Sequence, residues 1–507
     1  MKIKVLFFTG ILFIGIIFPV SCQNEKADID LKVTIDASLL DHFIEDGRLF
    51  FFITQNPNVE PRTQTWPSPF AKTHIFAKNI KGADADLSIE VEKFNTWTKT
   101  STWSPDDMAT GDYYVQVLWD QDNKESRINA PGNLYSEKKM VSLSGDEELE
   151  LILSKKIDPV EIVDHPLVKE IAFKSNLLSA WWNKPMHLKA TILLPNNYQK
   201  GKAYPIRYNV AGYGGRYHRI NNLVKSGRFI SWWESEDAPA VINVFLDGEG
   251  PFGDSYQMDS ENSGPYGQSL IEELIPYIEK KYRGTNSNKQ RYVDGCSTGG
   301  WVSLGLQLYY PDVFDGVFSY SPDAIDFENY QLINIYKDQN AFVNEFGYDR
   351  PVMRNTDGEP LLSLKEFIQY ENVLGPSDSY LTSGGQFSAH TALYSPKGKN
   401  GLPEPLFDPI SGAINPDVAA HWKKYDFKKY ATDNWSALGP KVQGKIYIWM
   451  GDMDHFYLNM ATRSFSDFLS STTAPKSDAT VDFTAMSGHC SAFSHREILE
   501  KIAEKLR

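Results

Sequence analysis

The spacing of apolar and polar positions divides the chain into two parts with different rhythms. Between about residues 28 and 160, short runs rich in β-branched and aromatic residues are separated by turn residues, as at 48–53 and 113–118. Residues 148–153 begin with alternating Glu and Leu, which is the period-two pattern of a half-buried strand. Because helical periodicity is scarce here, we predict an N-terminal β-sandwich domain over residues 28–160.

From about residue 173 to the C-terminus, apolar runs alternate with amphipathic stretches, which is the rhythm of an α/β sheet. Runs typical of buried strands stand at 190–195, 205–210 and 241–246. Residues 270–282 carry Leu and Ile at helical spacing, with Pro276 as the expected site of a bend. We therefore predict an α/β domain over residues 173–507, interrupted by a long insertion at residues 326–440.

The first 22 residues have a different pattern from both domains. Lys2 and Lys4 precede an almost wholly apolar run over residues 5–20, too short to span a bilayer as a helix, so we predict a signal peptide over residues 1–22. It ends in Ser21 and Cys22, which resembles the lipobox of bacterial lipoproteins, although Pro19 replaces the usual leucine. We expect an exported, outer-membrane lipoprotein lipidated at Cys22; ordinary cleavage near Cys22 is the alternative.

Composition and charge narrow the range of partners. Of the 507 residues, 41% are hydrophobic and 23% are charged, as in folded globular proteins. The net charge of −14 argues against a surface that binds nucleic acid or anionic lipid, so membrane contact is expected only through the lipid anchor. The chain has three cysteines, of which Cys296 and Cys490 would remain after processing at Cys22.

Residues 295–299 read Gly-Cys-Ser-Thr-Gly, which is the G-x-S-x-G nucleophile elbow. A predicted strand precedes the motif, and an apolar run that predicts a helix extends from Trp301 to Tyr310, where Pro311 stops it. The glycines are needed because the turn is too tight for a side chain two residues either side of the serine. In this context between strand and helix, the motif predicts that Ser297 is a nucleophile; an ordinary serine in a Gly-rich turn is the alternative.

A serine nucleophile requires a base and an orienting acid, which follow it in the order acid, then histidine. The predicted strand 445–450 is followed by two candidate acids, Asp452 and Asp454, and Asp323 is a third candidate. His489 lies in a loop between the last predicted strand, 481–485, and the final helix, which is where the base belongs. His495 opens that helix and is interpreted as a capping or surface residue.

The oxyanion hole requires two backbone N–H groups directed at the developing negative charge. One should come from Thr298, the residue after the nucleophile. The other should come from the Gly-rich loop after the strand 205–210, where we expect Tyr213 as the donor and Gly214 as the alternative. An acidic, Gly-rich stretch at 247–254 lacks the ligand spacing of an EF-hand, and no His/Cys cluster suggests zinc, so we expect no metal and no cofactor.

From about Leu177 onward the chain resembles the group of α/β hydrolases called putative esterases, which includes esterase D, enterochelin esterase, and the feruloyl and acetyl xylan esterases of carbohydrate esterase family one. The matching stretches are 204–205 with 212–215, 273–278 with 281–283, the elbow, 451–454 and 488–489. The resemblance implies the α/β-hydrolase fold, a lid at 326–440, and Asp454 as the acid, with Asp452 as the alternative. Ala211 departs from the family, which usually has His there.

A narrower resemblance concerns the cysteines that flank the nucleophile and the base. Tannase-type feruloyl esterases have the same Cys-Ser and His-Cys arrangement, in which a disulfide joins the two cysteines. This resemblance implies a disulfide between Cys296 and Cys490; two buried free thiols are the alternative.

Together these features predict an exported serine esterase with the triad Ser297, Asp454 and His489. By analogy with the family, we expect feruloyl or acetyl esters of polysaccharide or oligosaccharide as substrates. One alternative is an esterase for catecholate trilactone siderophores. Another, from a different class, is a non-catalytic lipoprotein that binds glycan. A prolyl-oligopeptidase-like peptidase is disfavoured because its propeller needs far more residues than the N-terminal part provides.

Overall fold

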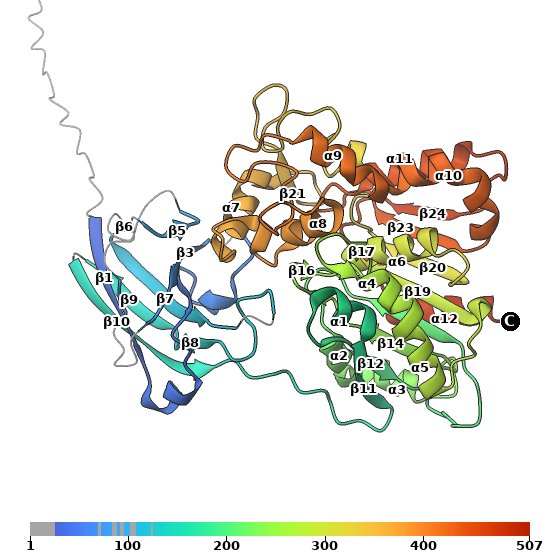
Figure 1. Ribbon diagram of the computed structural model, residues 1–507, viewed down its shortest axis with the longest axis horizontal. Coiled ribbons are helices and arrows are strands. Elements are labelled where there is room, and N and C mark those ends of the chain that lie inside the picture. The colour runs from blue at the N-terminus through green and yellow to red at the C-terminus, as the bar shows by residue number, and fades with distance from the viewer. Residues whose placement is uncertain are drawn as a thin grey trace, which may run out of the picture.

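A computed structural model describes residues 26–68, 72–83, 89–91, 96–101, 108–122, 125–144 and 146–507. The predicted signal peptide and Cys22 lie outside the described residues. An all-β unit occupies the N-terminal end of the molecule, and a larger α/β unit follows it (Figure 1). Within the described ranges no helix is both long and apolar enough to cross a membrane.

The N-terminal unit is all-β, as its alternating patterns predict. Its strands are β1 (Lys26–Ile35), β2 (Gly47–Thr54), β3 (Thr73–Ile80), β4 (Ile89–Val91), β5 (Thr98–Lys99), β6 (Met108–Ala109), β7 (Gly111–Asp120), β8 (Leu134–Ser136), β9 (Lys139–Leu143) and β10 (Asp146–Lys156). All ten are linked in one hydrogen-bonded sheet, with the order β4-β1-β10-β8-β7-β2-β3-β5 and with β6 on β1 and β9 on β7. The division into the two layers of a β-sandwich stays a prediction.

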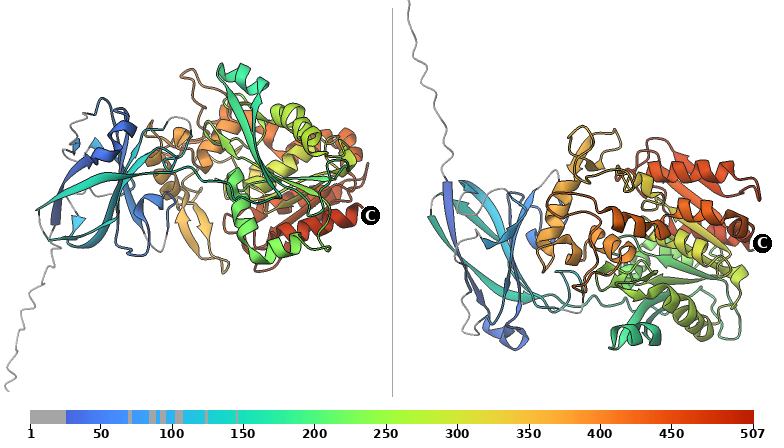
Figure 2. Two further views of the ribbon diagram at one scale, coloured as in Figure 1. Left: turned by 90° about the horizontal axis from the view of Figure 1, so that it is seen from below. Right: turned by 45° about the horizontal axis from the view of Figure 1, so that its top comes forward.

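Strand β2 shows how this unit is joined to the rest of the protein. Its alternate residues face two different cores, because successive side chains of a strand point to opposite faces. Leu49 and Phe51 pack with β1, β7 and β10 inside the unit. Phe50 and Phe52 pack instead with Tyr370 and other residues of α7 (Leu364–Leu374), which belongs to the long insertion. This face of β2 is therefore covered by the insertion, which lies against the N-terminal unit in both views of Figure 2.

The second unit is built on an eight-stranded sheet that is parallel after its first strands. Its strands are β11 (Val168–Ser175), β12 (Met186–Leu193), β13 (Ile206–Val210), β14 (Ile242–Leu246), β19 (Arg291–Cys296), β20 (Gly316–Tyr320), β23 (Ile446–Gly451) and β24 (Thr480–Thr484). The order is β11-β12-β14-β13-β19-β20-β23-β24, in which β12 is antiparallel to both neighbours and all later pairs are parallel. This topology confirms the predicted α/β-hydrolase fold.

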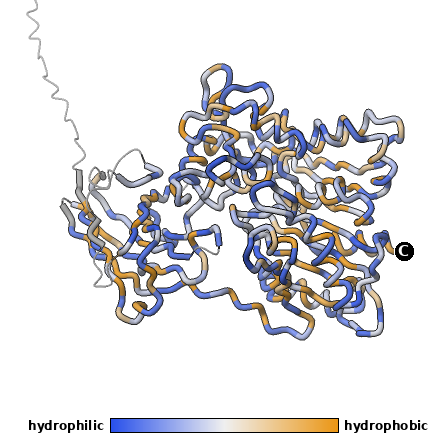
Figure 3. The backbone as a smooth tube through the Cα atoms, viewed as in Figure 1, coloured by the Kyte–Doolittle hydropathy of each residue, from blue (hydrophilic) through white to orange (hydrophobic). Residues whose placement is uncertain are grey.

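Helices cover both faces of this sheet, so its strands are apolar on both sides, and their orange segments run through the middle of the unit (Figure 3). One core includes side chains of α5, α6, α10 and α11, and the other includes those of α2, α3 and α12. The bounds are α2 (Ile220–Lys225), α3 (Gly227–Trp233), α5 (Ile275–Tyr282), α6 (Thr298–Tyr309), α10 (Phe427–Val442), α11 (Asn459–Ser471) and α12 (His495–Lys505). Within β19, Tyr292 faces the second core and Val293 faces the first.

The helix predicted over residues 270–282 is divided in two. A π-helical segment, η6 (Leu270–Leu274), leads into α5, and Pro276 lies in the first turn of α5. Proline has no backbone N–H and its ring clashes with the preceding turn, so the wider π turn accommodates it. The expected irregularity at Pro276 is present, in the form of this segment.

The long insertion is folded rather than open. It contains the hairpin of β21 (Pro351–Arg354) and β22 (Pro360–Ser363), together with α7, α8 (Gln386–Tyr394), α9 (Pro416–Trp422) and most of α10. Its aromatic residues Tyr380, Tyr394 and Trp422 are almost completely buried and form its core. Its predicted role as a lid stays a prediction.

Candidate active site

The turn between β19 and α6 has the geometry that the Gly-Cys-Ser-Thr-Gly motif predicts. Ser297 has φ 60° and ψ −128°, a left-handed conformation that a non-glycine residue rarely adopts. A Cβ atom at Gly295 would lie 2.5 Å from the backbone of Gly299, so glycine is required where the two arms of the turn pass each other. The amide N–H of Ser297 donates to Tyr320 O over 3.0 Å, which fastens the turn to β20.

Asp454 and His489 meet across two loops that follow neighbouring strands. Asp454 comes after β23 and His489 comes after β24, and Asp454 Oδ2 lies 2.7 Å from Nδ1 of His489. The other carboxylate oxygen of Asp454 accepts from the N–H groups of Phe456 at 2.9 Å and Leu458 at 3.3 Å, and the side chain is fully buried. With Nδ1 as the donor to Asp454, Nε2 of His489 is the basic atom.

The carboxylate of Asp454 changes the pKa of His489. Burial alone would lower the pKa of His489, but the carboxylate of Asp454 and its hydrogen bond outweigh burial, so that the pKa is raised above its ordinary value. An imidazolium at this position is thus stabilised by its neighbour. This is the property that a general base needs as it takes up a proton.

The two other carboxylates considered for the acid lie elsewhere. Asp452 is paired with Arg463 on the surface, and its side chain is 36% exposed. Asp323 accepts hydrogen bonds from Tyr256 and Thr298 rather than from His489. Of the three candidates, the structure brings Asp454 to the histidine.

A disulfide joins Cys296 to Cys490, with the two Cα atoms 6.0 Å apart. The N–H of Cys490 also donates to the hydroxyl of Ser321 at 3.1 Å. Since each cysteine is adjacent to a predicted catalytic residue, the bond fixes the loop of His489 beside the turn of Ser297. Both of these residues line one cavity.

The loop at residues 211–215, called the oxyanion loop below, lies against the nucleophile turn. A Cβ atom at Gly212 would be 3.3 Å from Cys296 O and 3.6 Å from Cβ of Ser297. Among the described residues, neither the backbone N–H of Tyr213 nor that of Thr298 donates a hydrogen bond. The N–H of Gly214, the alternative donor, is already bonded to Asp254 Oδ2 at 2.6 Å. In the described part of the chain, the N–H groups of Tyr213 and Thr298 thus differ from that of Gly214 in having no hydrogen-bond partner, and their role in an oxyanion hole stays a prediction.

The cavity around Ser297 has a volume of about 480 Å³, which is in the range of small-molecule sites. Most of its wall is apolar. Trp66 comes from the loop between β2 and β3 of the N-terminal unit, while Phe367 and Phe387 come from the insertion, and Phe456 and Leu458 follow the acid. The ring of Trp66 packs edge-on against Phe367 with centroids 4.6 Å apart. Three separate parts of the chain thus enclose the cavity.

The lining of the cavity also includes a cluster of polar side chains. The Oδ2 atom of Asp323 accepts from Tyr256 OH at 2.8 Å, from Thr298 Oγ1 at 3.0 Å and from Gln386 Nε2 at 3.1 Å. Burial would raise the pKa of Asp323, but its hydrogen bonds and His390 hold the pKa below the ordinary value, so the carboxyl group stays charged. Asp323, Gln386 and His390 all line the cavity. We call these three residues the polar floor.

One sequence-based interpretation needs correction. His495 is not a surface or capping residue: Ser494 caps α12, while His495 Nδ1 lies 3.0 Å from Arg207 and lines the cavity. Burial, together with Arg207 and Arg219, lowers the pKa of His495 well below its ordinary value. Burial beside cations is a tertiary effect that position in a sequence does not reveal.

The acidic stretch 247–254 is neutralised by arginines. Glu249 pairs with Arg216, and Asp254 lies 3.6 Å from Arg216 and 3.9 Å from Arg127. In the part of the chain that the structure describes, no group of three or more His, Cys, Asp or Glu side chains could hold a metal ion.

Sequence reasoning missed the contributions of Trp66, Arg127 and Gln386. Trp66 and Gln386 line the cavity and Arg127 lies against the oxyanion loop, each from a part of the chain remote from the motifs, so no local pattern marks them. Asp323 was noticed only as a possible acid, because it follows a strand of the parallel sheet as Asp454 does.

Comparison with known proteins places the α/β unit among esterases. The family model Esterase, described as "Putative esterase", matches residues 183–497. No curated protein matches the sequence.

Among solved structures, a ferulic acid esterase is 16% identical with a TM-score of 0.41, and the match covers 67% of this chain and 97% of that one. The fluorophosphonate-binding serine hydrolase F of Staphylococcus aureus is 14% identical with a TM-score of 0.38 and coverages of 67% and 98%. An S-formylglutathione hydrolase from Agrobacterium tumefaciens is 12% identical with a TM-score of 0.38 and coverages of 67% and 92%.

Proposed function

Because the chain belongs to the putative esterase family and is a serine carboxylic ester hydrolase, we propose that it hydrolyses esters of hydroxylated aromatic acids of the feruloyl class, carried on polysaccharide or oligosaccharide. The observation that carries this proposal is the cavity itself. It has an apolar wall large enough for an aromatic acyl group, and its polar residue Asp323 is hydrogen-bonded to Thr298, which directly follows the serine.

In the proposed mechanism, His489 takes the proton of Ser297 as the serine attacks the ester carbonyl. The negative charge that develops on the carbonyl oxygen is stabilised by the N–H groups of Tyr213 and Thr298. His489, held by Asp454, then protonates the leaving alcohol, and water hydrolyses the acyl-enzyme by the reverse proton path.

The dimensions of the cavity favour an aromatic acyl group over an acetyl group. An acetyl group would leave most of the 480 Å³ unfilled and would bury little of the apolar wall. A planar ring, in contrast, could lie among Trp66, Phe367 and Phe387, where aromatic rings gain additional stabilisation from edge-to-face contacts. Feruloyl esters therefore rank above acetyl esters as expected substrates.

The polar floor adds a preference for hydroxyl groups. A carboxylate is a strong hydrogen-bond acceptor, and Asp323 is held in its charged form. Among the described residues the hydrogen bonds to Asp323 all go to Oδ2, so Oδ1 remains an acceptor in a side chain that lines the cavity. A phenolic hydroxyl of the acyl group would satisfy it, whereas a carboxylate there would be repelled.

The first test is labelling with a fluorophosphonate, followed by mass spectrometry of the peptides, with Ser297→Ala in parallel. We expect the label on Ser297 and none on the variant. A folded protein that is not labelled would contradict the mechanism and favour the non-catalytic glycan-binding alternative.

The second test is a substrate series of methyl ferulate, methyl cinnamate, 4-nitrophenyl acetate and a catecholate trilactone. We expect the highest kcat/KM for ferulate, and we expect Asp323→Asn to reduce the preference for ferulate over cinnamate, which lacks the hydroxyl. Asp323 also accepts a hydrogen bond from Thr298. If the substitution displaced Thr298, kcat/KM would fall for cinnamate as well, so the cinnamate value of the same variant is the control. Rapid hydrolysis of the trilactone alone would move the function to siderophore release.

We also propose that the protein is exported and anchored through a lipid on Cys22. The support is the sequence of the first 22 residues and the Cys296–Cys490 disulfide, since disulfides persist in oxidising compartments. Metabolic labelling with radioactive palmitate should mark the protein, and Cys22→Ser should abolish the label. An unlabelled wild type in the membrane fraction would contradict lipidation.

A further inference from the structure

The oxyanion loop is held in place by a carboxylate outside it. Gly214 has φ +77°, and its N–H donates to Asp254 Oδ2 at 2.6 Å. Asp254 lies in β16 (Gly253–Asp254), and its side chain is 4% exposed. Because Gly214 follows Tyr213, this bond fixes the peptide next to the proposed oxyanion donor.

Asp254 depends in turn on two arginines. Its Oδ1 atom lies 3.6 Å from Arg216 and 3.9 Å from Arg127. Burial raises the pKa of Asp254 above its ordinary value, and Arg127 and Arg216 offset part of that rise. A charged carboxylate is a stronger acceptor for the N–H of Gly214 than a neutral one, so these cations strengthen the contact that holds the loop.

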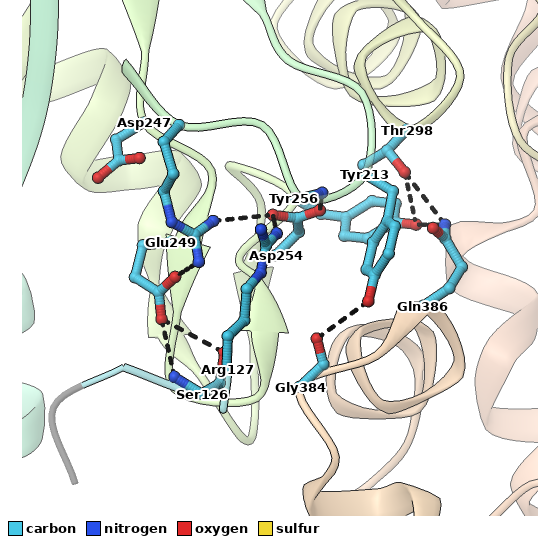
Figure 4. Close-up of polar contacts among 12 residues, drawn as sticks. Ser126, Arg127, Tyr213, Asp247, Glu249, Asp254, Tyr256, Thr298, Gly384 and Gln386 are labelled. Carbon is cyan, nitrogen blue, oxygen red and sulfur yellow. Dashed lines mark hydrogen bonds and ion pairs between the residues drawn. The ribbon is translucent and has the colours of Figure 1, made fainter. Parts of the chain in front are cut away.

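Arg127 comes from the N-terminal unit, in the loop between β7 and β8. Figure 4 shows Ser126 and Arg127 beside Glu249, Asp254 and Tyr213. The guanidinium lies 5.6 Å from the ring centroid of Tyr213, and a Cβ atom at Gly214 would lie 2.5 Å from one of its nitrogens. Arg127 is thus packed directly on the oxyanion loop.

The neighbouring residue holds Arg127 in this position. The backbone N–H and the hydroxyl of Ser126 donate to Glu249 Oε1 at 3.1 and 3.3 Å. Glu249 is also paired with Arg216, which belongs to the segment that leaves the oxyanion loop. The loop of the N-terminal unit is therefore bound at two successive residues.

We propose that Arg127, in the N-terminal β unit, is a positioning residue of the oxyanion hole, acting through Asp254 and Gly214. Through this one residue the N-terminal unit would support the oxyanion loop. The inference rests on the proposed role of Tyr213 in acyl transfer.

The proposed role predicts a specific kinetic signature. The oxyanion hole acts on charge that develops in the transition state, so a displaced donor lowers kcat more than it alters substrate binding. Removal of an oxyanion donor outright costs about 10²–10³ in kcat. Loss of a residue that only positions the donor should lower kcat less, on the order of tenfold, with little change in KM.

The experiment compares Arg127→Met and Arg127→Lys with the wild type on a 4-nitrophenyl ester. The concentration of active enzyme is taken from the end point of fluorophosphonate labelling, so that misfolded protein does not count. We expect kcat of Arg127→Met to fall on the order of tenfold, and Arg127→Lys to retain most of it because a cation remains beside Asp254. The rate of labelling should fall in parallel, since the phosphonyl oxygen occupies the same hole.

Lys72→Met is the matched control. Lys72 lies in the N-terminal unit and forms an exposed ion pair with Glu366 of the insertion at 3.6 Å, away from the oxyanion loop. This variant should retain the wild-type kcat. An unchanged kcat in Arg127→Met would overturn the inference, and so would an equal loss in Lys72→Met, which would indicate a general effect of docking. A wild type that is neither labelled nor active would instead refute the proposed function.

Discussion

Nδ1 of His489 and Oδ2 of Asp454 lie 2.7 Å apart, although 35 positions separate the two residues along the chain. The carboxylate is fully buried and also accepts two backbone N–H groups, so it cannot rotate away from the imidazole. Asp452, two positions earlier, is turned to the surface and to Arg463. Substitution of each aspartate in turn therefore tests which of the two orients His489.

Asp454→Asn should lower kcat by about 10³-fold or more, because an amide favours the wrong tautomer of His489 and does not stabilise the imidazolium. Asp452→Asn should leave kcat within about twofold, since exposed ion pairs contribute little. Steady-state kinetics on one ester decides the matter. The reverse ranking of the two variants would show that Asp452 is the acid.

The pH dependence should follow the raised pKa of His489. The histidine must be neutral to accept the proton of Ser297, so kcat/KM should rise with pH and level off above the pKa of the free enzyme. Because Asp454 raises that pKa, the midpoint should lie above the ordinary value of 6.5. A pH–rate profile of kcat/KM tests this, and a midpoint at or below 6.5 would contradict the proposed electrostatics.

The disulfide should stabilise the fold. It closes a loop with a sequence separation of 194, which the chain-entropy model values at up to about 5 kcal/mol. The double variant Cys296→Ala, Cys490→Ala should therefore unfold at a lower temperature, and a reducing agent should shift the wild type toward it while leaving the variant unchanged. Calorimetry with and without reductant gives the answer. Identical melting temperatures for all samples would exclude a stabilising role.

Trp66→Ala should weaken the binding of aromatic acyl groups. The ring is 37% exposed in the free protein and would be covered further by a bound aromatic acyl group. Its loss removes one wall of the cavity, so KM for methyl ferulate should rise by up to about tenfold, while values for 4-nitrophenyl acetate should change little. Trp181→Ala is a suitable control, since Trp181 is 49% exposed and lies outside this cavity. Equal effects on both esters would argue against a role for Trp66 in acyl recognition.

Glu371 should make the stability depend on pH. Its carboxylate accepts from the N–H groups of Phe387 and Ser388, yet burial dominates and raises its pKa to about 7. The folded protein thus binds this proton more tightly than the unfolded chain, whose value is near 4.5. The contribution of Glu371 to the free energy of unfolding is therefore complete below pH 4.5. This contribution falls by about 3 kcal/mol as the pH rises to about 7.

Urea unfolding of the wild type and of Glu371→Gln between pH 4.5 and 8 measures this contribution. The difference in unfolding free energy between the two proteins should change across this range, since other titrating groups are common to both. A constant difference would show that Glu371 keeps its ordinary pKa.

Features that depend on residues close together along the chain could be predicted from the sequence. The turn at Ser297 could be predicted because glycine at 295 and 299 is a local requirement, and the order of strands and helices places Asp454 and His489 after successive strands. The hydrogen bond that engages the N–H of Gly214 could not be predicted, because its acceptor, Asp254, lies 40 positions away in the chain.

Features that depend on the docking of the two units could not be predicted. Trp66 and Arg127 stand in a β unit whose alternating pattern reports only which residues face its own core. The same limitation explains His495, which was assigned to the surface because it opens a helix. Its environment is set by Arg207, a residue of a distant strand.

The position of Trp66 in the cavity bears on how the enzyme is made. The first strands leave the ribosome long before the segment with His489, so the cavity can close only when both ends of the chain have been synthesised and packed together. A nascent or truncated chain would carry the nucleophile without its complete surroundings. Hydrolytic competence would thus arise as the last step of biosynthesis, and the N-terminal unit could not be exchanged for an unrelated module without rebuilding the wall that it supplies.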